Sequence, residues 1–420
     1  MPVSQAFTLT QGGACPSVSF RYDGPMRRIA VIGGGPGGAH CGRALAEAGF
    51  DVTLFEPRDG FEKACGGGIP ARGVEAYPFL SDPHLPVRIV RRCLLIGPSG
   101  REAAVALEEP FYIYGRADLH RFLLDRAEAA GARRIRARVA DLTRSRAGDW
   151  RVNAVPLSGG LDEHGPFDFL VAADGAAGAI RRRLAGGVPA RHLTQGIGYY
   201  LPDVAEDTIT LKFYSGLNGY LWVFPRTDHS SAGICGPLGA VPANELRPLM
   251  DDFLRLRYGA DILARSRRYA ALIPGAPAES AASSMLGDGW AFVGDTGRSV
   301  DPLTREGIYF AMLAGDLLAR ALSARRAEAY PRAWAAGPGR EFAWAARHAA
   351  GFFNPRFIES LVTLCGESPT AARVLSDLIS GRQSYRSLRL RLLLSAPAIG
   401  WQVTRRRRLS AARLTPARDN

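Results

Sequence analysis

Residues 28–56, RIAVIGGGPGGAHCGRALAEAGFDVTLFE, decide the fold of this 420-residue chain. An apolar run leads into a turn with glycines at Gly33, Gly35 and Gly38, an alanine-rich segment follows, and a second apolar run closes on Glu56. This order predicts a strand, a glycine turn, a helix and a strand. The glycines permit the turn, the approach of backbone to a pyrophosphate, and close helix packing, while Glu56 is placed to bind a ribose. The segment predicts a dinucleotide site without distinguishing FAD from NAD.

Length and composition predict a globular chain of two packed domains, because 420 residues exceed one core of ordinary size. The formal net charge is +13, and residues 381–420 hold ten arginines against the single acid Asp419. Lys63 and Lys212 are the only lysines. Arginine enrichment of this kind also follows from a GC-rich genome, so we expect no nucleic-acid partner.

The six cysteines include no CxxC pair, which favours reduced thiols in a cytoplasmic protein and gives no metal site. Residues 1–24 lack a basic start followed by an apolar core, so they predict an N-terminal extension rather than a secretory signal. No apolar run reaches the roughly 18 residues that a membrane-spanning helix needs. We expect a chain that does not span a membrane.

Further elements follow from local patterns. Strands are expected at 87–111, 167–172 and 290–293, antiparallel strands at 199–236, helices at 117–130 and 306–322, and mostly helix after residue 323. The fold class is therefore α/β, with a Rossmann-like dinucleotide-binding domain, an antiparallel-sheet substrate domain and a helical C-terminal region. The expected boundaries are 1–26 for the extension, 27–85, 115–187 and 280–330 for the first domain, 86–114 and 188–279 for the second, and 331–420 for the helical region.

Two later segments favour FAD over NAD. The segment from Asp174-Gly175 to Gly178 resembles the second motif of flavoproteins with the para-hydroxybenzoate hydroxylase fold, and Gly294-Asp295 with Asp301-Pro302 resembles their third. Gly178 stands where those proteins often carry serine or threonine. Read alone, Asp174 and Asp295 are equally compatible with ordinary turns. The FAD-binding residues that this resemblance implies, beyond the first motif, are Arg116, Asp174, Gly175, Asp295, Pro302, Gly307 and Ile308.

Three further motifs specify the chemistry more closely. Lys63-Ala-Cys65-Gly66-Gly67-Gly68-Ile-Pro70 is similar to the K-x-C-G-G-G/A-x-P segment of the geranylgeranyl reductase family. Residues 220–225, YLWVFP, resemble its Y-x-W-x-F-P segment, and residues 301–308, DPLTREGI, resemble its D-P-x-x-x-E-G-I segment. The resemblance runs from about residue 28 to 322 and weakly to 394. Arg305 replaces a residue that is usually small.

The resemblance implies an FAD-dependent reductase that saturates carbon-carbon double bonds of a polyprenyl substrate. Cys65, Gly66 and Gly67 would be the catalytic loop, in which glycines let backbone lie near the flavin. With an ordinary thiol pKa near roughly 8.5, Cys65 would be largely protonated and could supply or shape the proton side. A small buried structural role for Cys65 is the alternative.

Tyr220, Trp222 and Phe224 alternate along one segment and so share a face. They are expected either to wall an isoprenoid channel as substrate-binding residues or to belong to an ordinary core. Lys63 also invites comparison with flavin halogenases, which carry an essential lysine, although a surface salt bridge is its plainer role.

Other functions on the same fold stay open. They are a monooxygenase hydroxylating an aromatic or polyketide substrate, a halogenase, and an FAD-binding protein without turnover. No second dinucleotide fingerprint is visible, so the electron donor is either NADPH bound transiently or a ferredoxin-like protein docking on arginines.

The tail carries leucine and arginine between Leu388 and Leu394, an apolar stretch with Trp401, and four arginines at 405–408. Such a segment fits peripheral contact with the anionic inner face of the cytoplasmic membrane. It fits equally a helix packed on the FAD domain with a solvated arginine end.

Overall fold

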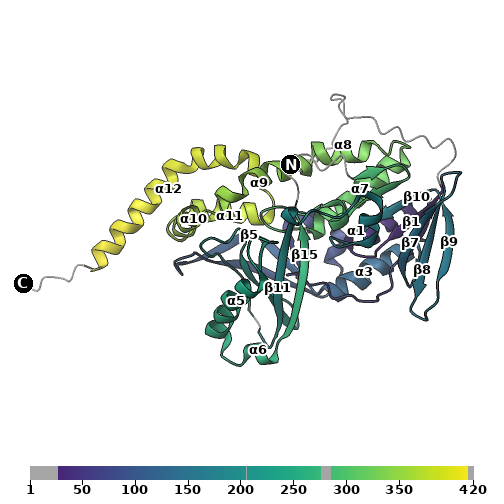
Figure 1. Ribbon diagram of the computed structural model, residues 1–420. Coiled ribbons are helices and arrows are strands. Elements are labelled where there is room, and N and C mark those ends of the chain that lie inside the picture. The colour runs from purple at the N-terminus through teal and green to yellow at the C-terminus, as the bar shows by residue number, and fades with distance from the viewer. Residues whose placement is uncertain (1–26, 205, 276–284, 415–420) are drawn as a thin grey trace, which may run out of the picture.

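The computed structural model describes residues 27–204, 206–275 and 285–414 (Figure 1). The extension expected at residues 1–26 lies outside them. The glycine-rich segment folds as predicted, with β1 (Arg28–Ile32), α1 (Pro36–Glu47) and β2 (Asp51–Phe55). These elements belong to a six-stranded sheet in the order β16 (Leu286–Gly287), β17 (Trp290–Phe292), β10 (Phe169–Ala172), β1, β2 and β6 (Arg133–Ile135). The pairs from β17 to β6 are parallel, and β16 is antiparallel to β17.

Both faces of this sheet are covered, as its uninterrupted apolar strands require. Ile29 and Val31 pack toward α1, α3 (Arg116–Ala129) and α7 (Ile308–Ser323). Ala30 and Ile32 point the other way, into a core shared with a three-stranded antiparallel sheet. That sheet comprises β7 (Ala137–Arg144), β8 (Trp150–Pro156) and β9 (Asp162–Phe167). The carboxyl ends of the parallel strands therefore form a protected edge where the glycine turn lies.

The second large sheet of the molecule has eight strands. Its order is β15 (Arg267–Pro274), β11 (Leu193–Pro202), β14 (His229–Pro237), β13 (Leu221–Pro225), β12 (Thr208–Lys212), β4 (Val87–Ile96), β5 (Glu102–Tyr114) and β3 (Gly68–Pro70). Neighbouring strands are antiparallel except β12 and β4, which pair in parallel. This one parallel pair joins two segments more than a hundred residues apart. The predicted α/β class with a second, largely antiparallel sheet is confirmed.

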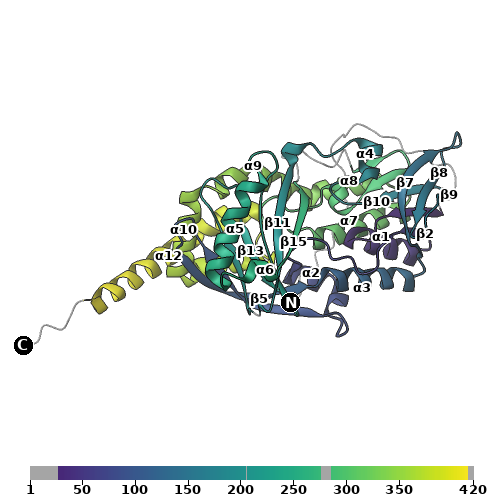
Figure 2. The same ribbon diagram turned by 60° about the horizontal axis from the view of Figure 1, so that its bottom comes forward.

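Helices cover the eight-stranded sheet on both faces (Figures 1 and 2). The face bearing Leu221 and Val223 packs on α5 (Ala243–Tyr258) and α6 (Ile262–Arg265). The face bearing Tyr220 and Phe224 is directed toward α9 (Pro338–Phe352), α10 (Pro355–Glu367) and α11 (Pro369–Ser380). The helical C-terminal region thus closes over the sheet rather than standing apart from it.

The remaining helices link these layers. They are α2 (Ala71–Ala76), α4 (Ala179–Ala185), α8 (Ala329–Ala336), α12 (Tyr385–Leu414) and the short 3-10 turns η1 (Pro78–Ser81), η2 (Ala190–His192) and η4 (Gly294–Gly297). Figures 1 and 2 show α12 leaving the body of the molecule as a long projecting helix. Over the described ranges, none of the helices combines the length and apolar character needed to cross a bilayer.

Candidate active site

The glycine turn after β1 is built as a cradle. Gly33 has φ +102°, and a side chain there would meet the backbone of Ala173, directly after β10. A Cβ at Gly38 would stand 1.9 Å from the carbonyl oxygen of Gly33, so α1 packs as closely as the backbone permits. At Gly35, by contrast, a Cβ would have no neighbour within 4 Å. The open glycine at the N-terminus of α1 leaves space where an anionic group would be favoured.

Glu56 directly follows β2, beside this turn, and is 4% exposed. Its carboxylate accepts hydrogen bonds from the backbone N–H of Gly34 at 2.8 Å and of Arg58 at 3.0 Å. Burial would raise the pKa of Glu56, but the nearby His120 and these N–H donors outweigh it and lower that pKa to about 2. Glu56 is therefore an ionised acceptor at neutral pH, which suits a ribose hydroxyl.

Arg116 supplies positive charge to the same edge. It is the first residue of α3 and is only 5% exposed, yet its Nε finds no hydrogen-bond partner in the described part of the chain. A buried guanidinium donor left unsatisfied is costly, so this geometry fits an anionic ligand. Together with the open Gly35 and the ionised Glu56, it shows that the residues present suit a dinucleotide with a pyrophosphate.

Asp174 and Gly175 join the dinucleotide turn to η4. The Asp174 carboxylate accepts the backbone N–H of Ile180 at 2.8 Å, and Gly175 donates its N–H to the Thr296 hydroxyl at 2.8 Å. A Cβ at Gly178 would stand about 2.2 Å from the Asp174 carboxylate, which explains why no serine or threonine stands there. Asp174 therefore holds the start of α4 in this structure.

Asp295 lies in η4, as does Thr296, and forms an ion pair with Lys63 Nζ at 2.5 Å. The lysine is 37% exposed and the carboxylate 15%. Lys63 therefore forms a salt bridge, as its plainer role predicted, but the salt bridge lies at the candidate site. The pair ties the loop that carries Cys65 to the loop expected to hold the cofactor.

The loop that carries Cys65 is hydrogen-bonded to residues of β14 and of the turn between β13 and β14. Arg226 has a fully buried side chain and donates to the Cys65 carbonyl at 2.7 Å and to Glu62 at 2.5 Å. Glu62 in turn accepts the N–H of Ala117 at the start of α3, at 2.8 Å. Ser231 on β14 donates a second hydrogen bond to the Cys65 carbonyl at 2.9 Å. The loop is therefore tied to the β13–β14 hairpin through Arg226 and Ser231 and to the start of α3 through Glu62.

The thiol of Cys65 does not have the ordinary pKa expected from the sequence. Burial would raise its pKa, but Arg116, the backbone N–H of Gly67, Lys63 and Arg226 outweigh burial and lower it. The Gly67 N–H lies 3.3 Å from the sulfur. The correction has a physical reason that the sequence does not reveal, since two of the three cations that lower the pKa, Arg116 and Arg226, come from distant segments.

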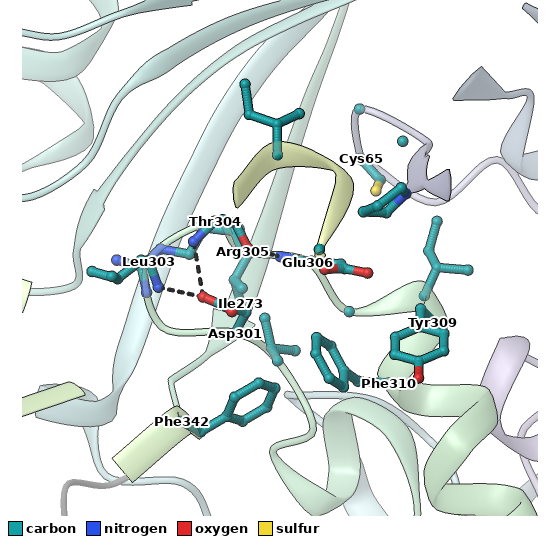
Figure 3. A pocket seen from close by; sticks show the side chains of 18 of the residues that line it. Cys65, Ile273, Asp301, Leu303, Thr304, Arg305, Glu306, Tyr309, Phe310 and Phe342 are labelled. Atoms are coloured by element: carbon teal, nitrogen blue, oxygen red, sulfur yellow. Dashed lines mark hydrogen bonds between the residues drawn. The ribbon is translucent and has the colours of Figure 1, made fainter. Parts of the chain in front are cut away.

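A cavity of about 610 Å³ begins at these residues. At one end it touches Pro36, Arg116, Asp295 and Gly307. From there it runs between the eight-stranded sheet and the C-terminal helices. Its apolar walls comprise Leu95, Phe111, Ile209 and Leu211 from the sheet, Phe213 directly after β12, and Phe342, Phe352, Leu361, Leu375, Leu378 and Ile379 from the helices. Figure 3 shows Cys65 and the loop of residues 301–306 on its border.

The loop from Asp301 to Glu306 fastens the helical region to the cavity. Asp301 accepts the N–H groups of Leu303 and Thr304 and, through both oxygens, the hydroxyl of Tyr385 at the start of α12 at 3.0 and 2.9 Å. Arg305, the departure from the family pattern, adopts φ +60°. The loop therefore takes a left-handed step immediately before Glu306.

Glu306 is a second ionisable group on the cavity wall. It forms an ion pair with Arg72, but its Oε1 has no hydrogen-bond partner among the described residues. Burial raises the pKa of Glu306 more than Arg72 lowers it. A buried carboxyl whose pKa is raised is a candidate proton donor.

The sequence-predicted residues fall into two groups. Those that border the cavity are Cys65, Gly66, Gly67, Arg116, Tyr220, Trp222, Phe224, Asp295, Gly307 and Ile308. The second group lies nearby: the turns after β1, β2 and β10 contain Gly33, Gly35, Glu56, Asp174 and Gly175, the first turn of α1 contains Gly38, and the loop between η4 and α7 contains Pro302. Their roles in binding or catalysis stay predictions.

Sequence reasoning missed the residues that hold the site together. Arg226 directly follows the Y-x-W-x-F-P segment, a position that could have drawn attention, but its target at Cys65 depends on a contact across 161 residues. Glu306 was named only as part of a motif. Nothing in the pattern after residue 323 indicated that those helices wall the cavity.

Comparisons with known proteins agree with this geometry. Residues 31–64 match the family model of the NAD(P)-binding Rossmann-like domain. The digeranylgeranylglycerophospholipid reductase of Methanoculleus marisnigri is 31% identical over 312 residues, which cover 70% of this chain and 76% of the relative. The menaquinone reductase of Mycolicibacterium smegmatis is 31% identical over 384 residues, covering 84% and 92%. The crystal structure of a geranylgeranyl bacteriochlorophyll reductase-like protein from Thermoplasma acidophilum superposes with TM-score 0.71 at 20% identity, covering 88% and 99%.

A Rossmann-like sheet beside a large cavity under a second sheet, together with relatives that are named reductases, places the chain among the oxidoreductases. The chain belongs to the geranylgeranyl reductase family of FAD-dependent oxidoreductases.

Proposed function

We propose that the protein binds FAD and saturates carbon-carbon double bonds of a polyprenyl chain held in the cavity. The observation that supports this most is the continuity of one cavity, which has the dinucleotide residues Arg116 and Asp295 at one end and apolar walls along the rest. A flexible hydrocarbon chain suits such walls, since its burial removes apolar surface from water. Tyr220, Trp222 and Phe224 would line its path.

The two larger sheets suggest how the chain divides into an FAD-binding part and a substrate-binding part. We propose that residues 27–85, 115–187 and 280–330 form the FAD-binding part and that 86–114 and 188–279 form the substrate-binding part. β3 belongs to the eight-stranded sheet although it lies within the first of these segments. This strand carries the catalytic loop from one part to the other.

In the proposed site Gly33, Gly35 and Gly38 admit the pyrophosphate, Arg116 pairs with its charge, and Glu56 accepts the ribose hydroxyls. Asp295, Pro302, Gly307 and Ile308 would hold the isoalloxazine end, and Asp174 with Gly175 would support it from the turn between β10 and α4. FAD, when bound and reduced, supplies a hydride to one alkene carbon. The chain's own groups exclude water and deliver a proton to the other carbon.

Two groups can serve that proton transfer. Cys65, with Gly66 and Gly67, lies on the cavity wall, but its lowered thiol pKa favours the thiolate and so weakens it as an acid. Glu306 has the opposite shift. We propose that Glu306 donates the proton and that Cys65 helps to position the alkene carbon that receives it. Comparing Cys65→Ala with Glu306→Gln tests this, because the proton donor's variant should lose most of kcat while KM changes little.

The decisive assay is anaerobic. Purified protein reduced with dithionite is mixed with a geranylgeranylated glycerophospholipid or with menaquinone, the two substrate classes that its relatives' names suggest. The proposal expects a mass gain of two hydrogens per turnover. If product appears only when oxygen is present and carries a hydroxyl or halogen, the monooxygenase or halogenase alternative replaces it. FAD binding without turnover would indicate a non-catalytic binder.

The electron donor and the cellular setting belong to the same proposal. NADPH bound transiently at the flavin face and an acidic ferredoxin-like protein docking on arginines both remain consistent with a net charge of +13. We propose that the reaction takes place at the surface of the cytoplasmic membrane, because polyprenyl lipids reside in bilayers.

A further inference from the structure

The solvent-facing side of α12 is unusually apolar. Leu390, Leu393, Leu394 and Trp401 are 61%, 72%, 75% and 63% exposed. Their spacings of three, four and seven residues place them on one side of the helix. Exposed leucines outside α12 lie in the loop between β8 and β9 or form the pair Leu249 and Leu256 on α5, whereas these four residues form a longer stripe.

The opposite side of α12 is the one that packs on the body. Ile399 is buried, Gln402 accepts from the Ser368 hydroxyl at 2.5 Å, and Arg406 and Arg407 bond to Gly366 and Glu367. The helix is therefore anchored through Ile399 and these polar contacts, which leaves the apolar stripe outward. An ordinary surface helix directs such a stripe toward the core.

Charge identifies what this stripe would meet. Residues 385–409 contain no acid, and Arg405 and Arg408 follow Trp401 by four and seven residues, on the same side. Both are exposed. A second copy of the same basic helix would be repelled, whereas an anionic lipid surface attracts arginine and accepts leucine and tryptophan at its interface.

The helix begins at the cavity. Gln383, Ser384, Tyr385 and Arg386 border it, and Tyr385 is bonded to Asp301. Leu390 lies five residues further on, roughly 7.5 Å along the helix axis. A bilayer that receives the stripe therefore lies close to this end of the cavity.

We infer that the outer side of α12, defined by Leu390, Leu393, Leu394, Trp401, Arg405 and Arg408, docks the enzyme on an anionic bilayer so that a lipid chain enters the cavity beside Tyr385. The inference rests on the proposed function for the identity of the lipid chain, but the docking itself needs no substrate.

The test is vesicle co-sedimentation of the full-length protein without substrate. Wild type should pellet with vesicles of phosphatidylglycerol and phosphatidylcholine and should remain in the supernatant with phosphatidylcholine alone. The triple variant Leu393→Glu, Leu394→Glu, Trp401→Glu should lose binding. The matched control Leu157→Glu, Leu161→Glu, Leu256→Glu changes charge equally at three other exposed leucines and should bind like wild type. Arg405→Gln with Arg408→Gln should weaken binding by roughly 30-fold at low salt.

Reductase activity on detergent-dispersed substrate separates this inference from the proposed function. The triple stripe variant, checked for wild-type folding by circular dichroism, should retain that activity and lose activity on vesicle-embedded substrate. The inference is overturned if wild type ignores anionic vesicles or if both triple variants lose binding equally. It is also overturned if the stripe variant instead abolishes a concentration-dependent dimer seen by analytical ultracentrifugation.

Discussion

Arg226→Met would remove both hydrogen bonds that a buried guanidinium makes to the Cys65 loop, leaving the Glu62 carboxylate without its cation. Breaking a buried ion pair on one side costs about 3 kcal/mol, and we expect a loss of that size in the free energy of unfolding. Urea denaturation measures it. Arg267→Met is the control, because Arg267 stacks on the same Tyr200 ring that Arg226 contacts but is exposed. Equal losses of stability in both variants would contradict a specific role of Arg226 in holding the Cys65 loop.

The thiol of Cys65 should react at lower pH than a free cysteine. Because its folded-state pKa is lowered, the thiolate forms below the ordinary range, and alkylation by iodoacetamide should have a midpoint below roughly 8.5. Lys63→Met and Arg116→Met should each move the midpoint upward, since each removes a cation that favours the thiolate. Peptide mass mapping of Cys65 follows the reaction. A midpoint at or above that of a free thiol would show that burial dominates instead.

At the level of elements, two glycines near the start of α1 are expected to serve different purposes. Gly38 is required for packing, whereas Gly35 is required for FAD binding. Gly38→Ala places a methyl group against the Gly33 carbonyl and should destabilise the protein by about 1–3 kcal/mol. Gly35→Ala meets no neighbour and should leave the stability of the FAD-free protein within roughly 0.5 kcal/mol, yet it should weaken FAD binding by intruding on the anion space. Thermal unfolding and flavin fluorescence titration give the two readouts. Similar melting temperatures for both variants would refute this division.

The contact between α12 and the 301–306 loop is a second element-scale test. Tyr385→Phe removes a hydroxyl that bonds both oxygens of buried Asp301, so about 1–3 kcal/mol of stability should be lost. Hydrogen exchange should show faster opening of residues 298–307, while the six-stranded sheet stays protected. Uniformly faster exchange would mean that the contact supports the whole fold rather than this loop.

The elements differ in how much the sequence could predict of them. β1, the glycine turn, α1 and β2 are set by local periodicity and glycine spacing, so residues 28–56 were predictable. The alternation of Tyr220, Trp222 and Phe224 correctly indicated a common face, since all three border the cavity. The parallel pairing of β12 with β4, the reach of Arg226 to Cys65 and the altered thiol pKa were not predictable, because each depends on contacts between distant segments. The packing of α12 on α9, α10 and α11 and the bond of its Tyr385 to Asp301 belong with these.

The whole molecule encloses the cavity between parts that are distant in sequence, so its volume should set the length of chain that it accepts. Leu211→Trp adds bulk to the sheet wall and should lower kcat/KM for a twenty-carbon prenyl chain by about tenfold or more, while sparing a ten-carbon chain. Leu211→Met is the volume-matched control. A chain-length series with each variant measures the effect, and parallel losses at every length would argue against a steric origin.

The wall formed by α9–α11 has a consequence for how such enzymes diversify. The predicted FAD-binding residues all lie before residue 309, whereas much of the apolar wall of the cavity lies after residue 337. Exchanging that C-terminal segment between relatives is therefore a modular operation: the chimaera would inherit its redox centre from one parent and its lipid preference from the other.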